Sequence, residues 1–514
     1  MQFNETSKGK NQVVNYEDAL AYRLSPKWHL YASVVTASLG DKFYETSSDR
    51  LAVIFHLMRK TDPQFVARLA IYARERMNLR SIPLVMAVEL AKIHSGDRLV
   101  RQMVSRIIGR ADEITELLAY YQMANGRWKE TKKLNRLSKQ LQAGLQNAFN
   151  KFDEYQFAKY NRDAEITLRD ALFLVHPKAK DEAQQLIFNK IVENKLETPY
   201  TWETELSALG QTKFESEKAK KEAFARKWEE LIDSGRVGYM ALLRNLRNIL
   251  LADVSPEHID TVCKTLRDKQ KVLHSKQLPF RFLAAYRELS QIKTDFKSEY
   301  LSKKVKNVRV NFIGFAKDEN SYDVMMSLVS KVMNALEEAV KVTAENIAGF
   351  DESTKVLIAC DVSGSMQTPI SPKSKVMNYD IGLMLGMLLK SRCKNAVSGI
   401  FGDTWKIVNI PDSGVLSNVD AFYKREGEVG YSTNGYLVVQ DLTERQVVMD
   451  KIMIFTDCQL WDSTGNDTVL KDVWKKYKAI APEAKLYLFD LAGYGQVPLD
   501  ITGDDVFLIA GWSD

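Results

Sequence analysis

The chain has 514 residues, of which 45% are hydrophobic and 27% charged, and its formal net charge is +6. This length exceeds what one hydrophobic core usually serves, so two globular domains are expected. No apolar run is long enough to span a membrane, and the first residues lack the pattern of a signal peptide, so we expect a cytoplasmic protein. Four cysteines without metal-ligand spacing, Cys263, Cys360, Cys393 and Cys458, indicate free thiols in a reducing compartment.

The first 350 residues have the pattern of consecutive helices. Apolar residues recur at helical spacing over residues 51–58, 65–76, 83–93 and 99–108. Pro63 and Pro83 suit first turns, and Asp62 or Thr61 can cap the helix that follows. Short helices in succession predict a solenoid of the HEAT or armadillo kind, with a single helical globule as the alternative.

Charge is divided unevenly between the two parts of the chain. Residues 351–514 carry a net charge of −6. Because the whole chain carries +6, the 350 residues before them carry +12. A basic surface of this size favours a polyanionic partner, chiefly nucleic acid. The alternative is that the lysines lie on ordinary solvated helix faces.

Strands alternate with helices in residues 351–514. Short buried-strand patterns and helical patterns follow one another at residues 356–360, 375–392, 397–401, 451–455, 469–477, 486–489 and 506–509. This alternation predicts a second domain built on a doubly wound parallel sheet.

Oxygen-bearing side chains follow two of these strands. Asp361, Ser363 and Ser365 come at the end of the first strand, Thr433 lies in a later polar loop, and Asp457 ends the strand after it. Carboxyl ends of parallel strands meet at one edge of a sheet, where ligands bind. Carboxylates and hydroxyls suit a hard cation, so we expect Mg²⁺ or Mn²⁺ here. Each residue alone also fits a turn or a helix cap.

The same residues give this part a family resemblance. It resembles a von Willebrand factor A domain that carries a metal-ion-dependent adhesion site. Such domains usually have two glycines before the threonine and one after the second aspartate, whereas this chain has Tyr431, Ser432 and Cys458 there. No general base stands beside a polarised water and no histidine partners the serines, so a binding site is expected rather than a catalytic centre.

The basic part carries a second resemblance in several separated motifs. They are Tyr22-Arg23-Leu24-Ser25, residues 62–74, Arg80-Ser81-Ile82-Pro83, residues 240–246 and residues 278–282. Together they resemble the TROVE module of the Ro autoantigen family, in which a von Willebrand factor A domain follows the module. The domains are thus expected at residues 1–350 and 351–514.

The Ro resemblance implies a function as well as a fold. In that family the HEAT-like repeats form a ring closed by the A domain. Small structured Y-type RNA binds the outer basic surface, and single-stranded 3′ ends of misfolded RNA enter the central cavity. The resemblance implies a non-catalytic protein of RNA quality control or small-RNA stabilisation, a monomer within a ribonucleoprotein, working with a nuclease or an RNA ligase. Phosphate binding of this kind should weaken steeply with salt.

One stretch resembles the segment of the family that contacts Y RNA. The resemblance assigns RNA contacts to Lys159, Arg162 and His176, and Lys178 can join the same patch. The alternative for His176 is a helix cap before Pro177.

A polar stripe interrupts an otherwise apolar helix further along the chain. Arg244 and Arg247 alternate there with Asn245 and Asn248. The arginines can grip phosphates through bidentate hydrogen bonds. Equally, they can fasten adjacent repeats to each other.

A second class of function remains open. In it the protein is a metal-dependent protein–protein scaffold, whose A-domain cation captures a carboxylate of a partner while the helices display it. RNA binding and partner recruitment are compatible in one chain.

Overall fold

The computed structural model describes residues 12–37, 46–126, 137–161, 164–306, 319–345, 350–370, 374–411 and 414–511. The chain divides into two compact units. The sheet unit comprises Met1–Tyr22, Thr201–Leu491 and Pro498–Ile509, and the repeat unit comprises Arg23–Tyr200, Ala492–Val497 and Ala510–Asp514. Each unit combines segments that are separate in the sequence, so this division does not test the domain boundary expected after residue 350. That boundary stays a prediction.

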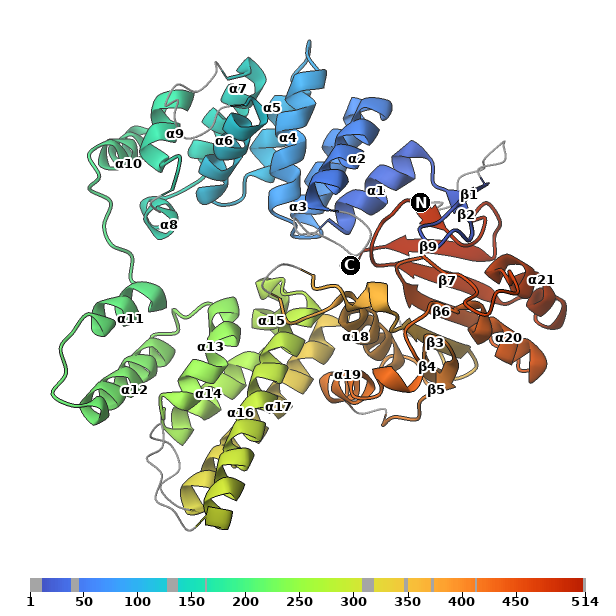
Figure 1. Ribbon diagram of the computed structural model, residues 1–514. Coiled ribbons are helices and arrows are strands. Elements are labelled where there is room, and N and C mark those ends of the chain that lie inside the picture. Colours follow the sequence, from blue (N-terminus) through green and yellow to red (C-terminus); the bar gives the residue numbers. More distant parts are fainter. Residues whose placement is uncertain are drawn as a thin grey trace. The chain divides into compact units, whose positions relative to one another are not determined.

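The repeat unit is built from ten of the helices in the described residues (Figure 1). They are α1 Pro26–Val35, α2 Ser47–Lys60, α3 Pro63–Glu75, α4 Ser81–Ile93, α5 Leu99–Ile107, α6 Asp112–Ala124, α7 Lys139–Phe149, α8 Glu154–Tyr160, α9 Leu168–Val175 and α10 Glu182–Val192. The short strand β8, Gln496–Val497, also belongs to this unit.

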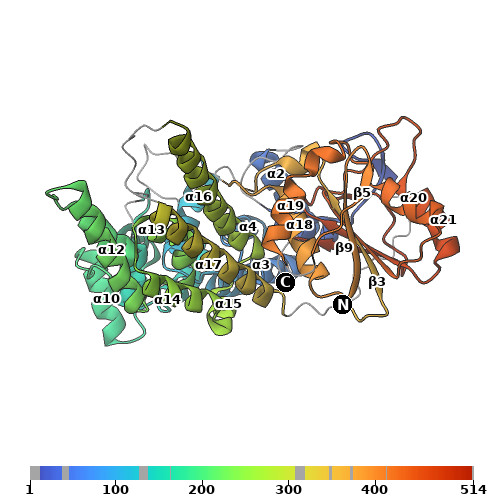
Figure 2. The same cartoon turned by 90° about the horizontal axis from the view of Figure 1, so that it is seen from below.

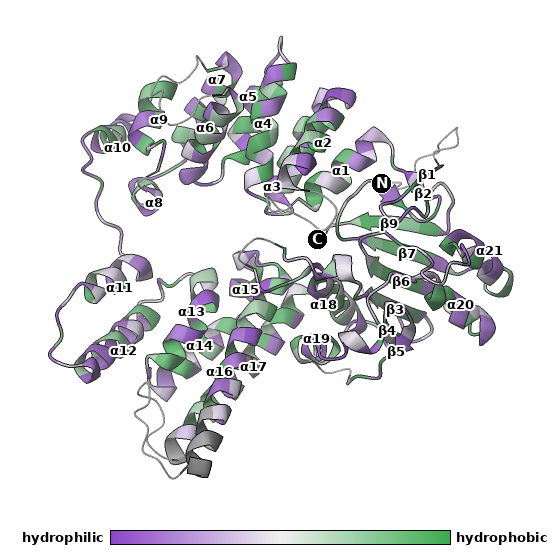
Figure 3. Ribbon diagram, viewed as in Figure 1, coloured by the Kyte–Doolittle hydropathy of each residue, from purple (hydrophilic) through white to green (hydrophobic). Residues whose placement is uncertain are grey.

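These helices stack in two rows. Along one row α1 contacts α3, α3 contacts α5 and α5 contacts α7, while α2, α4 and α6 contact one another in order along the other. Helix α4 lies between neighbours on several sides and is hydrophobic along most of its length (Figure 3). Each helix therefore buries its apolar face on its neighbours, as the predicted HEAT-like solenoid requires.

The start of α3 follows the expected capping pattern. The carboxylate of Asp62 accepts a hydrogen bond from the N–H of Phe65 at 3.0 Å, and Pro63 occupies the first turn. Thr61 instead ends α2. Asp62 is therefore the cap, and the missing N–H of Pro63 removes a donor that would have no partner within the helix.

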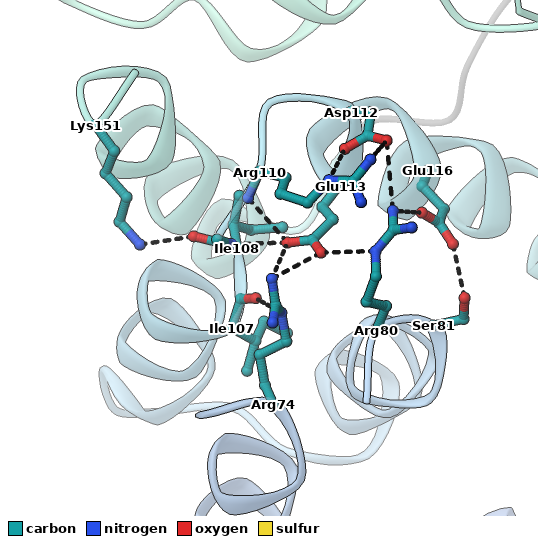
Figure 4. Close-up of polar contacts among 11 residues, drawn as sticks. Arg74, Arg80, Ser81, Ile107, Ile108, Arg110, Asp112, Glu113, Glu116 and Lys151 are labelled. Atoms are coloured by element: carbon teal, nitrogen blue, oxygen red, sulfur yellow. Dashed lines mark hydrogen bonds and ion pairs between the residues drawn. The ribbon is translucent and has the colours of Figure 1, made fainter. Parts of the chain in front are cut away.

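A buried carboxylate joins several helices of the repeat unit. Glu113 is fully buried and accepts hydrogen bonds from Arg74 at 2.9 and 3.1 Å and from Arg80 at 3.2 Å. The N–H groups of Gly109 and Arg110 also donate to it, at 2.7 and 3.1 Å (Figure 4). Arg74 and Arg80, which belong to the TROVE-like motifs, are thus structural: they hold α3 and the start of α4 against α6.

The sheet unit contains the remaining helices of the first 350 residues. They are α11 Trp202–Gly210, α12 Glu217–Asp233, α13 Tyr239–Leu251, α14 Pro256–Arg267, α15 Lys269–Ser275, α16 Pro279–Lys306 and α17 Glu319–Thr343. Helices α16 and α17 lie side by side and antiparallel (Figure 2). A small hairpin, β1 Gln12–Val14 and β2 Leu20–Arg23, pairs antiparallel.

A six-stranded sheet forms the rest of this unit. Its order is β5 Trp405–Ile407, β4 Asn395–Phe401, β3 Lys355–Asp361, β6 Lys451–Thr456, β7 Lys485–Asp490 and β9 Val506–Ala510. Strands β4, β3, β6 and β7 are parallel, whereas β5 is an antiparallel strand at the edge that the sequence pattern did not reveal.

Helices cover both faces of this sheet. Helices α18 Asn378–Lys390 and α19 Leu416–Tyr423 lie on one face, and α20 Tyr436–Glu444 and α21 Leu470–Ile480 lie on the other (Figure 1). The predicted doubly wound sheet is confirmed, and so is the fold class of a helical repeat array followed by an A-type domain.

Two further expectations concern free cysteine thiols and membrane-spanning helices. All four cysteines are free, and Cys263, Cys360 and Cys458 are buried. Within the described ranges, no helix combines the length and the apolar character needed to cross a membrane.

Candidate functional site

The five residues expected to hold a metal meet at the carboxyl edge of the sheet. Asp361 ends β3 and Asp457 directly follows β6, the strand paired with β3 in parallel. Thr456, the last residue of β6, donates from Oγ1 to Oδ2 of Asp361 at 2.6 Å. The parallel register therefore brings the two carboxylates to the same edge.

Two loops bring the hydroxyls to this edge. The Oγ atoms of Ser363 and Ser365 lie 3.3 Å apart, and Ser365 lies in the short 3₁₀ helix η1, Gly364–Gln367. The N–H of Gly364 donates to the carbonyl of Tyr431 at 3.0 Å, which joins this loop to the one that carries Thr433.

The loop that follows β6 completes the arrangement. Thr433 Oγ1 donates to the carbonyl of Gln459 at 2.9 Å, while the N–H of Gln459 donates to Oδ1 of Asp457 at 3.0 Å. All five expected residues are buried. They form the cluster that we call the carboxyl-edge site: Asp361, Ser363, Ser365, Thr433 and Asp457.

Burial makes the two carboxylates of this site hard to ionise. Burial raises the pKa of Asp361 to about 6. Burial and then the negative charge of Asp361 raise the pKa of Asp457 to about 7, although the Ser365 hydroxyl and the N–H of Gln459 offset part of this rise. Two carboxylates held this close without a counter-charge repel each other.

The donor set of the carboxyl-edge site fits a hard cation. Oδ2 of Asp457 is buried and has no hydrogen-bond partner among the described residues. A divalent cation would satisfy this oxygen and neutralise the paired charges. No group of three or more His, Cys, Asp or Glu side chains is suitably placed for a metal in the described part of the chain, so the hydroxyls and water would supply the other ligands.

The departure from the usual A-domain pattern is visible in the backbone. Cys458 has φ +63°, in the left-handed region that favours glycine, and its side chain is fully buried. This is the position where the family usually has glycine after the second aspartate. The cysteine therefore keeps the turn of the family at the expense of backbone strain.

Lys159 lies among aromatic rings on α8. Its Nζ is 5.8 Å from the ring centroids of both Tyr155 and Tyr160, and the guanidinium of Arg110 lies 4.2 Å from the Tyr160 ring. Tyr155 is 48% exposed, so its ring is open to a stacking base. Tyr155 is not among the residues expected from the sequence, although its spacing of four residues from Lys159 places both on one helix face. Arg162 lies outside the described residues.

His176 and Lys178 lie on the turn after α9. His176 ends the helix in a left-handed conformation with φ +48°, and its N–H donates to the carbonyl of Leu172. The side chains of His176 and Lys178 are exposed, and the amide of Asn150 on α7's end donates to the carbonyl of Lys178 at 2.9 Å. His176 is therefore a helix cap with an exposed side chain, and its role in RNA binding stays a prediction.

The polar stripe lies on α13 in the sheet unit. Arg244 is exposed, whereas Arg247 lies 3.9 Å from a carboxylate oxygen of Glu288 on α16. The amide of Asn245 donates to its own helix, and Asn248 donates to Asn245. The two amides are thus engaged within α13, Arg247 faces α16, and Arg244 is the member most open to a ligand.

The chain matches a known family over most of the helical part. The TROVE domain model matches residues 30–194 and again residues 193–349. Proteins named telomerase protein component 1 from rat and mouse are each 26% identical to it over an alignment of 319 residues, and the match covers 46% of this chain. The match covers only 12% of each of those relatives.

A solved structure resembles the fold as a whole. The crystal structure of the Ro (RSR) protein of Deinococcus radiodurans aligns with a TM-score of 0.55 at 16% sequence identity, covering 95% of this chain and 97% of that one. The family match covers more than half of the chain. The chain therefore belongs to the TROVE domain family, in the Ro arrangement of a TROVE module followed by a von Willebrand factor A-like domain.

Proposed function

We propose that this protein is a Ro-like, non-catalytic RNA-binding protein. It holds small structured RNA of the Y type on a basic surface of the repeat unit and serves small-RNA stabilisation or RNA quality control. The observation that carries this proposal is the exposed ammonium of Lys159 beside the half-exposed ring of Tyr155 on α8, together with the exposed side chains of His176 and Lys178 after α9.

Physical chemistry supports RNA as the ligand. Cations that are not neutralised by carboxylates attract phosphates, and an exposed tyrosine beside a lysine offers a face for an unpaired base. Arg244 on α13 supplies a separate cationic position, suited to the single-stranded 3′ end of a misfolded RNA in the central cavity that Ro proteins have.

The test is RNA recovery and affinity. The variant Lys159→Ala/Arg162→Ala/His176→Ala should lose most of the RNA that copurifies with the protein and bind a small structured RNA at least about tenfold more weakly. A control variant with the exposed lysines Lys218, Lys475 and Lys476 changed to alanine should keep both. Unchanged recovery and salt dependence in the first variant would show that this surface is not the RNA site.

A second activity is favoured by the buried Oδ2 of Asp457, which has no hydrogen-bond partner in the part of the chain that the structure describes. We propose that the carboxyl-edge site binds Mg²⁺ or Mn²⁺ through Asp361, Ser363, Ser365, Thr433 and Asp457. The cation would supply a coordination position for a carboxylate of a protein partner. A nuclease or an RNA ligase is the kind of partner that suits RNA quality control in the cytoplasm.

A further inference from the structure

A wide groove runs between α3 and α5 in the repeat unit, and none of the residues assigned above lines it. Its volume is about 790 Å³, and α3, α5, the residues before α5 and one residue of α7 line it. Four arginines line it: Arg68 from α3, Arg98 and Arg101 at the start of α5, and Arg106 further along α5. The groove is therefore concave and basic.

The arginines of the groove differ from the other arginines nearby. Arg74 and Arg80 bind Glu113, and Arg110 binds Asp112 (Figure 4).

By contrast, the side chains of Arg68, Arg98 and Arg101 make no hydrogen bond, ion pair or ring contact with any residue that the structure describes. Arg106, the fourth arginine of the lining, is paired with Glu75. Asp97, the one carboxylate among the described lining residues, is engaged by His94 and by the N–H of Leu99. Three like charges in one groove repel each other, so they favour an anion with several charges.

The lining of the groove indicates which part of an RNA it suits. Besides the arginines it offers the polar side chains of Gln64, Gln102 and Ser105. Its described lining contains no aromatic side chain, whereas proteins that bind single strands use aromatic platforms for stacking. Guanidinium and amide groups without stacking suit phosphates and 2′-hydroxyls, which a double-stranded stem presents in regular order.

The groove adjoins the surface around His176. Asn147 on α7 donates to Ser105 Oγ in the groove wall at 3.0 Å, and its neighbour Gln146 donates to the carbonyl of His176 at 3.2 Å. The two basic surfaces thus flank a single helix, whose diameter is about 10 Å. One stem that crosses α7 can contact both.

We propose that the α3–α5 groove is a second RNA-contact surface, which holds the phosphate backbone of a double-stranded stem independently of its sequence. This inference rests on the proposed RNA-binding function. It assigns an RNA stem to residues that the proposed function did not include.

The test compares two RNA probes on the full chain. The groove variant is Arg68→Gln/Arg98→Gln/Arg101→Gln, and the control variant is Arg226→Gln/Arg392→Gln/Arg445→Gln, which removes the same charge from exposed positions of the sheet unit. The probes are a blunt RNA duplex of about 16 base pairs and an unstructured single strand of the same length. Thermal unfolding checks that each variant is folded.

The groove variant should bind the duplex at least about tenfold more weakly than the wild type, and its plot of log affinity against log salt should be shallower by about 2 to 3. Single-strand affinity should change less than about twofold, and the control variant should match the wild type with both probes.

Three other outcomes are informative. Wild-type protein that binds neither probe would overturn the proposed function itself. Wild-type protein that binds the duplex, together with a groove variant that binds it equally well, would overturn the groove and leave the function standing. Equal losses for duplex and single strand would overturn the assignment to a stem.

Discussion

Arg287 on α16 and Asp380 on α18 form a buried, two-pronged ion pair. Both Nη atoms of Arg287 donate to the carboxylate of Asp380, each at 2.6 Å, and Asp380 is fully buried. Oδ2 of Asp380 also accepts from the N–H of Met377 at 2.8 Å, and the guanidinium lies 4.9 Å from the ring centroid of Tyr423. The pair therefore fixes the start of α18, the helix that follows the loop of Ser363 and Ser365, against α16.

Removing Arg287 should be strongly destabilising. Arg287→Ala leaves the buried Asp380 carboxylate without its charged partner, which costs about 3–5 kcal/mol of unfolding free energy. Urea unfolding followed by circular dichroism measures the loss. The exposed pair Arg445 and Asp441 is the matched control, because breaking it should cost no more than about 0.5 kcal/mol. Equal losses of unfolding free energy in Arg287→Ala and Arg445→Ala would show that the buried pair stabilises the fold no more than an exposed one does.

Glu113 should matter more than its neighbour Glu116. Glu113→Gln puts an amide donor among Arg74, Arg80 and two backbone N–H groups, so about 3 kcal/mol should be lost and amide exchange in α6 should quicken. Glu116 also binds Arg80 but is 39% exposed, so Glu116→Gln should cost less than about 1 kcal/mol. Similar effects of the two changes would contradict the central position of Glu113.

Helical periodicity predicted the repeat unit well because its signals are local. The pattern at residues 99–108 corresponds to α5, Leu99–Ile107, and the Asp62 cap lies where a carboxylate precedes a helical proline. Buried runs likewise located β3 and β6, since strands covered on both faces are continuously apolar. Family motifs gave the order of the two parts.

Long-range pairing could not be predicted in the same way. Arg74 looked like one more basic residue of a motif, and its partner Glu113 is 39 positions away. The short edge strand β5 has three residues, too few for a period to be recognised. Arg68, Arg98 and Arg101 are distinguished by having no partner among the described residues, which is a property of the fold and cannot be read from the sequence.

His29 should make the repeat unit sensitive to mild acid. Burial, followed by the positive charges of Arg50 and Arg23, lowers the pKa of His29 to about 4. The unfolded chain therefore binds more protons than the folded one between about pH 4 and 6.5. The contribution of neutral His29 to the free energy of unfolding is fully present above this range and is lost as the pH falls through it. The loss is on the order of 3 kcal/mol.

Comparison of variants isolates this contribution. Urea midpoints of the wild type and of His29→Gln should converge as the pH falls from 7 to about 4.5. His56→Gln, at an exposed position, should follow the wild type throughout. A constant difference between the wild type and His29→Gln would mean that His29 contributes by packing alone.

Cation binding at the carboxyl-edge site should depend on pH. Because the pKa of Asp361 is raised to about 6 and that of Asp457 to about 7, protons compete with a metal around neutrality. Mn²⁺ affinity, measured by calorimetry, should therefore rise from pH 6 to pH 8, by up to about tenfold per unit for each proton displaced. Without metal, the free energy of unfolding should fall as the pH rises. The folded state holds more protons than the unfolded one between about pH 4 and 7, so ionisation of these two carboxyl groups destabilises the folded state.

Asp361→Ala should abolish Mn²⁺ binding while leaving RNA affinity within about twofold, and Asp467→Asn, in an exposed loop, should change neither. If a folded Asp361→Ala protein lost RNA as well, the separation of the metal site from the RNA surface would be wrong, and retained Mn²⁺ binding would place the cation elsewhere.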